Sequence, residues 1–401
     1  MDAATTPVIL SAARTPVGKL GGALAPLSAG ELGAAVVRAA VERAHLPHLE
    51  EIDEVMIGNV IAAGAGQNVA RQAAIWGGLP ASVGASSLNK VCGSGLKAVM
   101  LAAQAIKAGD GALFVVGGVE SMSNAPHLVR GRRGQLRLGH LALEDAILTD
   151  GLGCPFEHWL MGDAAEFIAD AFEVTREEMD RYALGSHQKA IAAMDNGQFA
   201  DEIVPITVKQ HKGETVTVTQ DEGPRRDTSL EKLAALPPAF KKQGGKVTAG
   251  NSPGLSDGAA ALVVASQAKA QQIGARPLAR IVGYAQVAQA PKLIFDAPAR
   301  AILRLLERVG WRLDQVDLIE INEAFAAQVL ANGCALAEHG WDWAKVNVNG
   351  GAVALGHPLG ATGARILVTL LHALRQRGLQ RGIATLCLGG GEAVAVAVEQ
   401  L

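Results

Sequence analysis

Two stretches of the chain repeat the same order of hydrophobic and polar positions. In the first, apolar residues recur at helical spacing over 31–43 and lead to a run rich in β-branched residues at 52–59. In the second, a helical pattern over 299–309 leads to a similar run at 316–322. Spacing near 3.6 residues predicts an amphipathic helix, and a short β-branched run between turns predicts a strand. Each run ends in asparagine, so the sequence indicates an internal duplication.

The two repeats stay in register beyond these strands. Cys92 follows Asp53 by 39 positions, and His357 follows Asp317 by 40. At both points a glycine-rich turn opens a long apolar helical run, after which a buried strand ends in glycines. The runs are 96–107 and 361–377 for the helices, and 112–116 and 383–388 for the strands. Cys92 and His357 therefore occupy equivalent turns.

The halves differ in the connection after this strand. In the second half the last strand, 393–398, comes at once as a hairpin partner, whereas its counterpart, 259–265, comes some 140 positions after the preceding strand. The intervening segment is more charged and has helical and strand patterns of its own. Insertions are tolerated in such connections, so we expect an inserted domain. The predicted boundaries are 1–118 with 252–272 for the N-terminal half, 119–251 for the insert and 273–401 for the C-terminal half.

Strands that alternate with helices predict an α/β protein with two doubly wound sheets covered by helices. The helical runs after Cys92 and His357 are almost entirely apolar, which is typical of helices buried on all sides. We therefore expect the halves to share a central layer formed by these two helices. Their N-termini would bring Cys92 and His357 to one site.

Composition and charge exclude several classes of function. The 401 residues exceed one simple core, and 49% hydrophobic content with 47 glycines suits a packed α/β protein. A net charge of −3 gives no electrostatic basis for binding nucleic acid or an anionic membrane. The four cysteines lack the short spacing of a zinc site, so no bound metal is expected. The N-terminus lacks signal-peptide features, and we expect a cytoplasmic protein.

The segment 89–95 (NKVCGSG) has the features of a catalytic turn. Cys92 stands just before a predicted helix, where unpaired N–H groups and the helix dipole favour thiolate. Gly93, Ser94 and Gly95 are small and leave room for a substrate near the sulfur. A buried structural cysteine explains the same heptapeptide equally well, so this segment alone does not decide between nucleophile and core.

Three further segments place polar or reactive side chains at a strand end or a helix start. Asn322 follows a strand, His357 opens a helix, and Cys387 precedes the glycines 389–391. Taken singly, each has an ordinary explanation as a turn residue, a loop histidine or a core cysteine. In α/β units, however, strand ends and helix starts meet at one edge, so we expect these groups to gather with Cys92.

These four segments, in this order, resemble the signature sequences of the thiolase family, and the similarity runs nearly from end to end. Further matching segments are 117–123 (GGVESMS), 161–162 with 165–166, and 247–251 with 257–260. The resemblance implies duplicated βαβαβαββ halves in a five-layer αβαβα arrangement, with an inserted loop domain. It also implies acyl transfer through a cysteine, with formation or cleavage of carbon–carbon bonds in 3-ketoacyl-CoA. Coenzyme A and acyl-CoA are then substrates, and no permanently bound cofactor is expected.

The resemblance also implies a role for each reactive group. Cys92 attacks the thioester and carries the acyl group, while His357 takes the thiol proton. Cys387 is the base that removes a proton from the α-carbon of a second acetyl-CoA, whose enolate attacks the acyl-enzyme. His357 and a water held by Asn322 form one oxyanion site, and the backbone N–H groups of Cys92 and Gly389 form the other.

Coenzyme A contacts are implied mainly in and around the insert. The residues at matching positions are Met161, Arg225, Phe240, Ala249, Ser252 and Phe325. Arg225 stands beside Arg226, and such a pair can hold phosphate, although a solvated basic pair explains it too.

Subunit contacts are implied by the same resemblance. The basic residues Arg130, Arg132, Arg133 and Arg137 belong to an extended loop that we assign to a subunit interface rather than to nucleic acid. The family forms dimers paired into tetramers, so a homotetramer without nucleic-acid or membrane partners is expected.

The chain departs from the family pattern around the expected substrate pocket. Pro253 replaces a serine, Leu160 replaces a histidine, the loop 288–298 differs considerably, and Glu392 follows the glycine turn. These changes predict an altered chain-length preference or weakened activity, and they leave the four reactive residues intact.

These residues favour some functions over others. The leading expectation is condensation of two acetyl-CoA to acetoacetyl-CoA and its reverse, with a longer-chain 3-ketoacyl-CoA thiolase as the alternative. A β-ketoacyl synthase would pair its cysteine with two histidines or His and Asn, without Cys387. A non-catalytic acyl-CoA or lipid-binding relative would not need both Cys92 and His357. A nicotinamide dehydrogenase would need Gly-x-Gly-x-x-Gly after the first strand, and this is missing.

Overall fold

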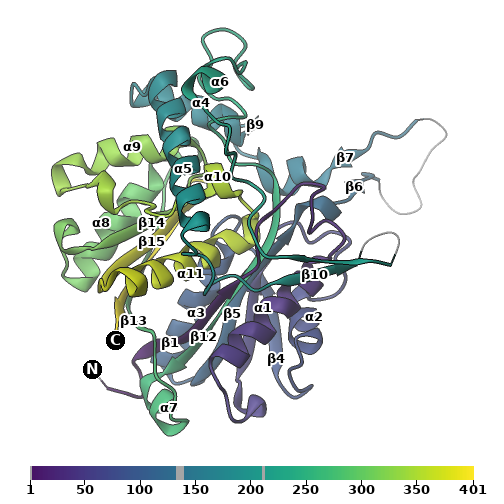
Figure 1. Cartoon of the computed structure of the whole chain (residues 1–401), viewed down its shortest axis with the longest axis vertical. Helices are drawn as coiled ribbons and strands as arrows, with labels where there is room; N and C mark the ends of the chain where they lie inside the picture. The colour runs from purple at the N-terminus through teal and green to yellow at the C-terminus, as the bar shows by residue number, and fades with distance from the viewer. Residues whose placement is uncertain (1, 132–139, 210–212) are drawn as a thin grey trace.

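Two similar α/β halves lie side by side, and a further segment of the chain covers their upper edge (Figure 1). This computed structural model describes residues 2–131, 140–209 and 213–401. Within those residues, no helix combines the length and the apolar character needed to cross a membrane.

The N-terminal half is assembled from segments on both sides of the insert. Its strands are β1 (Pro7–Arg14), β2 (Gly18–Lys19), β3 (Glu54–Gly58), β4 (Gly84–Leu88), β5 (Leu113–Ser121) and β12 (Ser256–Ser266). Its helices are α1 (Ala29–Arg43), α2 (Val69–Trp76), α3 (Ser94–Ala108) and α7 (Gln267–Gln272).

The C-terminal half is continuous in sequence. Its strands are β13 (Ala279–Ala288), β14 (Leu318–Ile321), β15 (Arg381–Leu388) and β16 (Glu392–Gln400). Its helices are α8 (Ala297–Val309), α9 (Ala326–Leu336), α10 (Ala352–Leu355) and α11 (Leu359–Arg377).

The insert has short strands and three α-helices within its described residues. The strands are β6 (His127–Leu128), β7 (Glu144–Asp145), β8 (Gly153–Cys154), β9 (Trp159–Leu160), β10 (Ile206–Lys209) and β11 (Thr215–Val218). The helices are α4 (Met161–Ala171), α5 (Arg176–Asp195) and α6 (Leu230–Ala234).

The strands of both halves hydrogen-bond into one path, in the order β14-β15-β16-β13-β1-β12-β5-β3-β4, with β2 beside β12. The sequence predicted two sheets, and the structure joins them at β1 and β13 through only two pairs, Val8↔Arg280 and Ile9↔Ala279. Both strands change register just beyond this point, β1 after Ile9 and β13 after Ile281. Such bulges bend and twist strands, so the two sheets separate immediately after they meet.

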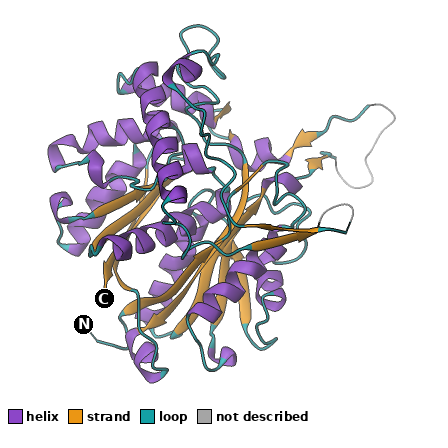
Figure 2. Cartoon of the chain, in the orientation of Figure 1, coloured by secondary structure: helices purple, strands orange, loops and turns teal. Residues whose placement is uncertain are grey.

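Helices α3 and α11 fill the space between the two sheets. Leu96 of α3 and Leu367 of α11 are fully buried in one cluster with Val116 of β5 and Val396 of β16. Helices α1 and α2 cover the outer face of the N-terminal half, and α8 and α9 cover that of the C-terminal half. Helices and strands therefore stack in five layers (Figure 2), and the predicted αβαβα fold is confirmed.

The elements reproduce the predicted duplication. Strand β3 lies parallel to β5, and β14 lies parallel to β15. Strands β15 and β16 form a tight hairpin, whereas their counterparts β5 and β12 are antiparallel neighbours separated in sequence by the insert.

Local sequence explains where the principal helices begin and end. Ser28 and Glu31 form a capping box at the start of α1, which satisfies two backbone N–H groups there. Helix α11 starts after Pro358, which cannot donate a backbone hydrogen bond, and ends at Gly378 with φ of +64°.

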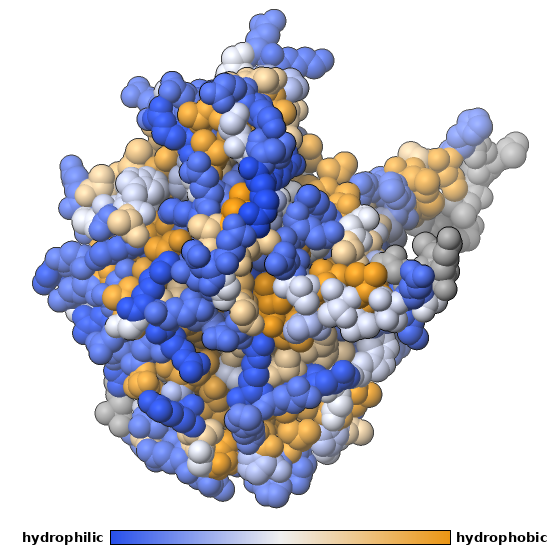
Figure 3. Space-filling view, viewed as in Figure 1, coloured by the Kyte–Doolittle hydropathy of each residue, from blue (hydrophilic) through white to orange (hydrophobic). Residues whose placement is uncertain are grey.

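The surface is largely hydrophilic, with hydrophobic residues gathered where β6 and β7 project (Figure 3). Val129, Leu141 and Leu143 beside these strands are 48%, 53% and 63% exposed. Arg130 pairs with Glu144 at 2.6 Å. The other arginines assigned to an interface, Arg132, Arg133 and Arg137, lie outside the described residues.

Candidate active site

The loop before α3 holds Cys92 in a strained turn. Val91 has φ of +46°, a conformation that β-branched residues rarely adopt. Val91 N donates to Asn89 Oδ1 at 2.9 Å, and Lys90 N donates to Ser94 Oγ at 2.8 Å. Strain of this kind costs about 1–3 kcal/mol and persists only where the surroundings enforce it. These hydrogen bonds thus fix the position of the Cys92 sulfur.

His357 stands just before α11 and is oriented by two hydroxyl groups. Its backbone N–H donates to Ser256 Oγ at 3.2 Å. Its ring Nδ1 lies 2.7 Å from Thr362 Oγ1, and that hydroxyl donates its own hydrogen to Pro358 O at 2.8 Å. Thr362 can therefore only accept from the ring, so Nδ1 carries the hydrogen. Nε2 keeps a lone pair and can act as a base.

Cys387 lies near the end of β15 and is 1% exposed. The turn after it contains Gly390 and Gly391, with φ of +91° and +88°. A Cβ at Gly391 would lie 2.6 Å from Gln289 O, so a side chain does not fit there. This turn brings the backbone N–H of Gly389 to the Cys92 sulfur, beside the N–H of Cys92 itself.

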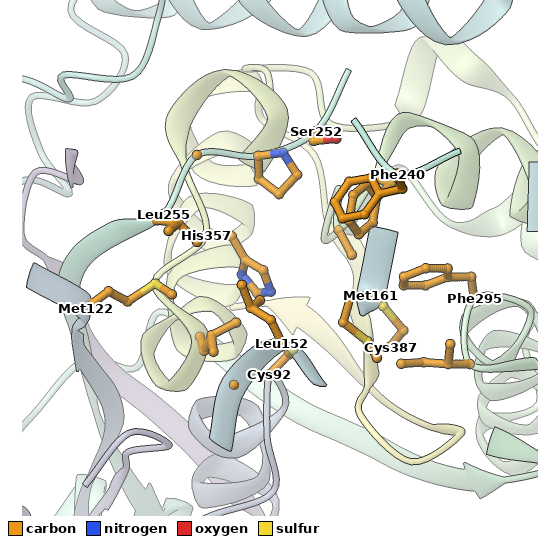
Figure 4. Close-up of a pocket in the computed structure, with 17 residues that line it drawn as sticks. Cys92, Met122, Leu152, Met161, Phe240, Ser252, Leu255, Phe295, His357 and Cys387 are labelled. Atoms are coloured by element: carbon orange, nitrogen blue, oxygen red, sulfur yellow. The ribbon is translucent and has the colours of Figure 1, made fainter. Parts of the chain in front are cut away.

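Cys92, His357 and Cys387 point into one cavity of about 160 Å³ from three separate segments (Figure 4). Four predicted coenzyme A contacts, Met161, Phe240, Ser252 and Phe325, line the same cavity. The remaining walls are mostly apolar and comprise Met122, Gly151, Leu152, Pro253, Gly254, Leu255, Ile294, Phe295, Ala324 and Leu359.

The three reactive groups are electrically neutral in the resting site. Burial raises the pKa of the Cys92 thiol to about 12, although the N–H groups of Cys92 and Gly389 oppose the rise. Burial also raises the pKa of Cys387 well above its usual range. It lowers the pKa of His357 to about 3, with a further contribution from the charge of Arg365. The N–H groups at the helix start favour thiolate, as the sequence indicates, but desolvation outweighs them and the resting Cys92 is a thiol.

Asn322 lies directly beside His357. Its Nδ2 is 3.4 Å from His357 Nε2, and the residue is completely buried. Its Oδ1 has no hydrogen-bond partner among the described residues, which is unusual for a buried amide. Asn322 therefore presents a free acceptor next to the imidazole, although it is not among the residues that line the cavity.

Two predicted coenzyme A contacts lie in an adjoining cavity. Arg225 and Ala249 line a space of about 320 Å³ that shares Ser252, Gly254 and Leu255 with the first cavity. The backbone N–H of Arg225 donates to His187 Nδ1 at 3.1 Å. Arg226 is not part of this lining and instead pairs with Asp195 on the surface at 2.5 Å.

Some of the residues that depart from the family pattern line the main cavity, and others lie outside it. Pro253, Ile294 and Phe295 line the main cavity, as expected. Leu160 is 36% exposed and does not line it, because β9 turns this side chain outward. Glu392 forms an ion pair with Lys90, which connects the Cys387 turn to the Cys92 loop.

Several residues around the cavity have no role that the sequence alone indicated. Met122 lies against it at the end of the 117–123 motif, and Leu152 and Leu359 complete that wall. Glu120, in the same motif, is fully buried near Cys92. The motif itself was the signal that could have identified Glu120 and Met122.

No group of three or more His, Cys, Asp or Glu side chains is placed to hold a metal ion in residues 2–131, 140–209 and 213–401. The chemistry of the cavity rests on two thiols, an imidazole, a carboxamide and backbone N–H groups.

Comparison with known proteins agrees with the geometry. Residues 7–268 match the family model "Thiolase, N-terminal domain", and residues 275–400 match "Thiolase, C-terminal domain". The acetyl-CoA acetyltransferase of Pseudomonas aeruginosa is 53% identical, over 97% of this chain and 98% of the relative. That of Cupriavidus necator is 52% identical, over 99% and 100%. The crystal structure of the Bacillus anthracis acetyl-CoA acetyltransferase matches with a TM-score of 0.95 and 46% identity, over 99% of each chain. This chain belongs to the thiolase family of acyltransferases.

Proposed function

We propose that the protein is an acetyl-CoA C-acetyltransferase that joins two acetyl-CoA into acetoacetyl-CoA and free coenzyme A, and also runs the reverse reaction. This proposal rests on the observation that two thiols and a neutral imidazole share one cavity. The names of the relatives at about 50% identity support acetyl-CoA as the substrate.

The first half-reaction transfers an acetyl group to Cys92. The thiol is neutral at rest, so its proton must leave as the sulfur attacks the thioester carbonyl. Nε2 of His357 has the lone pair to accept that proton. The bond between the carbonyl carbon and the coenzyme A sulfur then breaks, and the departing thiolate takes the proton back from His357. An acetyl-cysteine and free coenzyme A result.

The second half-reaction forms the carbon–carbon bond. Cys387 passes its thiol proton to the free Nε2 of His357, and its thiolate then removes a proton from the α-carbon of a second acetyl-CoA. The resulting enolate attacks the acetyl carbonyl on Cys92. The bond to the Cys92 sulfur breaks, acetoacetyl-CoA leaves, and the Cys92 thiolate takes the proton held by His357, so that Cys92, Cys387 and His357 are all neutral again. The high pKa of Cys387 makes its thiolate a strong base once its proton has been lost.

The negative oxygens of these steps require hydrogen-bond donors. The N–H groups of Cys92 and Gly389 converge on the position of the Cys92 sulfur, which suits the acyl carbonyl. The free acceptor of Asn322 beside His357 suits a bound water that would complete the second oxyanion site.

Coenzyme A would enter through the adjoining cavity. Arg225 and Ala249 would meet its nucleotide end, while Ser252, Phe240 and Met161 would enclose the pantetheine arm. Coenzyme A acts here as substrate and leaving group, and no resident cofactor has a part in the steps. We assign residues 119–251 as the insert that supplies most of these contacts, within a cytoplasmic homotetramer.

A longer-chain 3-ketoacyl-CoA thiolase is the second candidate. The apolar wall formed by Ile294, Phe295 and Pro253, at positions that depart from the family pattern, favours it. Apolar walls stabilise hydrocarbon chains more than an acetyl group, by about 0.8 kcal/mol for each buried methylene.

Mass spectrometry after incubation with acetyl-CoA and longer acyl-CoAs tests both candidates. The acetyl group should appear on Cys92 in the wild type, be missing in Cys92→Ala, and persist in Cys387→Ala, which should not condense. Cys334→Ala, at an exposed cysteine, is the matched control and should behave as wild type. Labelling at another residue, or normal condensation by Cys387→Ala, would refute the assignment. Faster thiolysis of longer 3-ketoacyl-CoAs would select the second candidate.

A further inference from the structure

The starts of α3 and α11 touch through their backbones. A Cβ at Gly95 of α3 would lie 2.8 Å from Ala364 N of α11. A Cβ at Gly118 of β5 would lie 1.9 Å from Gly360 O. Side chains do not fit at these distances, so glycine is required at both positions. The two helices that follow the reactive cysteine and histidine are therefore seated directly against each other and against β5.

One buried carboxylate at this junction takes no part in the proposed steps. Glu120 of β5 is 0% exposed. Its Oε1 accepts from Asn59 Nδ2 at 2.8 Å and from Ile61 N at 3.1 Å. Its Oε2 accepts from Val60 N at 3.1 Å and from Gly360 N at 2.9 Å. All four partners are donors, so these hydrogen bonds favour the ionised form of the carboxylate, which offers four acceptor positions.

The partners of Glu120 belong to the two loops that must meet. Gly360 lies three positions after His357, in the first turn of α11. Val60 belongs to the turn after β3, and its carbonyl accepts from Asn89 Nδ2 in the Cys92 loop at 3.4 Å. Met122, two positions after Glu120, lines the cavity (Figure 4).

We infer that Glu120 is a positioning residue for the acyl transfer: it binds the start of α11 to the turn after β3 and so sets the place of His357 relative to Cys92. This inference rests on the proposed function. Geometry of this kind matters because a displacement of about 1 Å in a reacting group can lower a rate about 100-fold.

The negative charge of Glu120 allows a second test, which does not depend on the rate of acetyl transfer. It lies close enough to Cys92 to help raise the pKa of that thiol. The other titratable groups that face the Cys92 sulfur are His357 and Cys387, and the one that faces Glu120 is Asp257. Burial and Asp257 raise the pKa of Glu120 to about 7, against its backbone donors. Removal of the charge should therefore misplace His357 and, at the same time, make the Cys92 thiolate easier to form.

Glu120→Gln tests this with opposite effects on two reactions. The amide has the same shape, but its NH₂ faces two N–H donors. Acetyl transfer from acetyl-CoA to Cys92 should fall about 10- to 100-fold. Alkylation of Cys92 by iodoacetamide at a fixed alkaline pH should rise on the order of 3- to 10-fold. Glu120→Asp keeps the charge and should transfer acetyl faster than Glu120→Gln. The exposed Glu307→Gln on α8 is the control and should match wild type.

Each outcome has a defined meaning, provided that circular dichroism shows a native fold. Wild-type acetyl transfer by Glu120→Gln would overturn the inference, and so would alkylation that is unchanged or slower. Equal loss in Glu120→Asp and Glu120→Gln would overturn it too. If Glu120→Gln does not fold, Asn59→Ala removes one donor and leaves the carboxylate; acetyl transfer should then fall about 3- to 10-fold, and wild-type transfer would overturn the inference. A wild-type protein that takes no acyl group from any acyl-CoA would instead refute the proposed function.

Discussion

At the scale of single residues, the site keeps its reactive groups uncharged until a substrate arrives. The cavity removes water from the Cys92 thiol and the His357 imidazole, which penalises thiolate and imidazolium alike. Charge then forms only during reaction, next to the N–H groups of Cys92 and Gly389. The N–H groups at the start of α3 therefore stabilise the negative charge of the transition state rather than a thiolate in the resting site.

The alkylation of Cys92 should accordingly rise with pH through the alkaline range. Only the thiolate reacts, so the rate grows about tenfold per pH unit below the pKa of the thiol. With that pKa raised to about 12, the rate for the native protein should still be rising at about pH 10. The same cysteine in urea-unfolded protein should level off at about pH 8.5. Iodoacetamide labelling of the Cys92 peptide, read by mass spectrometry, measures both profiles. A plateau of the native profile at the unfolded midpoint would contradict a desolvated, neutral thiol.

At the scale of elements, an ion pair joins two loops from opposite halves. Lys90 precedes Cys92 by two positions, and Glu392 begins β16 after the glycine turn. Their side chains are 20% and 29% exposed, so the pair is partly shielded from solvent. The pair holds the turn that supplies the Gly389 N–H close to the loop that supplies the sulfur.

Glu392→Gln should therefore reduce acetyl transfer about 2- to 5-fold, since partly exposed pairs contribute about 1 kcal/mol or less. Lys90→Gln should have the same effect, and the double variant should be no worse than either single one, because both remove one interaction. Steady-state rates at low and high salt measure this, and salt should bring wild type toward the variants. Glu177→Gln, in the exposed pair with Arg181, is the control. Additive losses would show that the two side chains act separately.

The close contact between β5 and α11 should tolerate only glycine at position 118. Gly118→Ala should lower the free energy of unfolding by about 1–3 kcal/mol or more, because its Cβ would lie 1.9 Å from Gly360 O. Gly185→Ala on α5 is the matched control: nothing lies within 4 Å of its Cβ, and alanine should stabilise the helix by roughly 0.5–1 kcal/mol. Urea unfolding of the two variants compares them. A similar shift in both would mean that the junction between β5 and α11 can open without cost.

At the scale of the whole molecule, the sequence predicted the features that depend on local periodicity and on motifs. Helical spacing ahead of β3 and β14 revealed two related halves, and the apolar runs after Cys92 and His357 placed α3 and α11 in the centre. The motifs that resemble the thiolase family led to the same three reactive side chains, which the structure brings to one cavity.

Other features depend on contacts that periodicity does not encode. The two pairs that join β1 to β13 occur between bulges in both strands, and no sequence pattern marks them. The rise in the pKa of Cys92 results from burial by residues distant in sequence, which the local argument from the helix start does not include. Leu160 occupies a pocket position in the family pattern, yet β9 turns it outward.

The insert is tied to the N-terminal half by a buried ionic cluster. Arg14 of β1 donates from Nε to Glu202 at 2.6 Å and from Nη1 to Asp221 at 2.7 Å. All three side chains are 0% exposed. Asp221 also accepts from the backbone N–H of Val17 at 2.7 Å. Both carboxylates belong to the proposed insert, so this cluster connects the segment that holds most of the proposed coenzyme A contacts to the sheet.

Asp221→Asn should therefore weaken the whole molecule and not only its own loop. Loss of one charge leaves the Arg14 guanidinium buried with incomplete neutralisation, which typically costs about 3–5 kcal/mol. Urea unfolding should shift accordingly, and limited proteolysis should cut the insert of the variant before the sheet. Asp195→Asn, in the exposed pair with Arg226, should change stability by less than about 0.5 kcal/mol. If the two variants unfold alike, the insert is held by its apolar contacts, and Arg14 does not couple it to the catalytic halves.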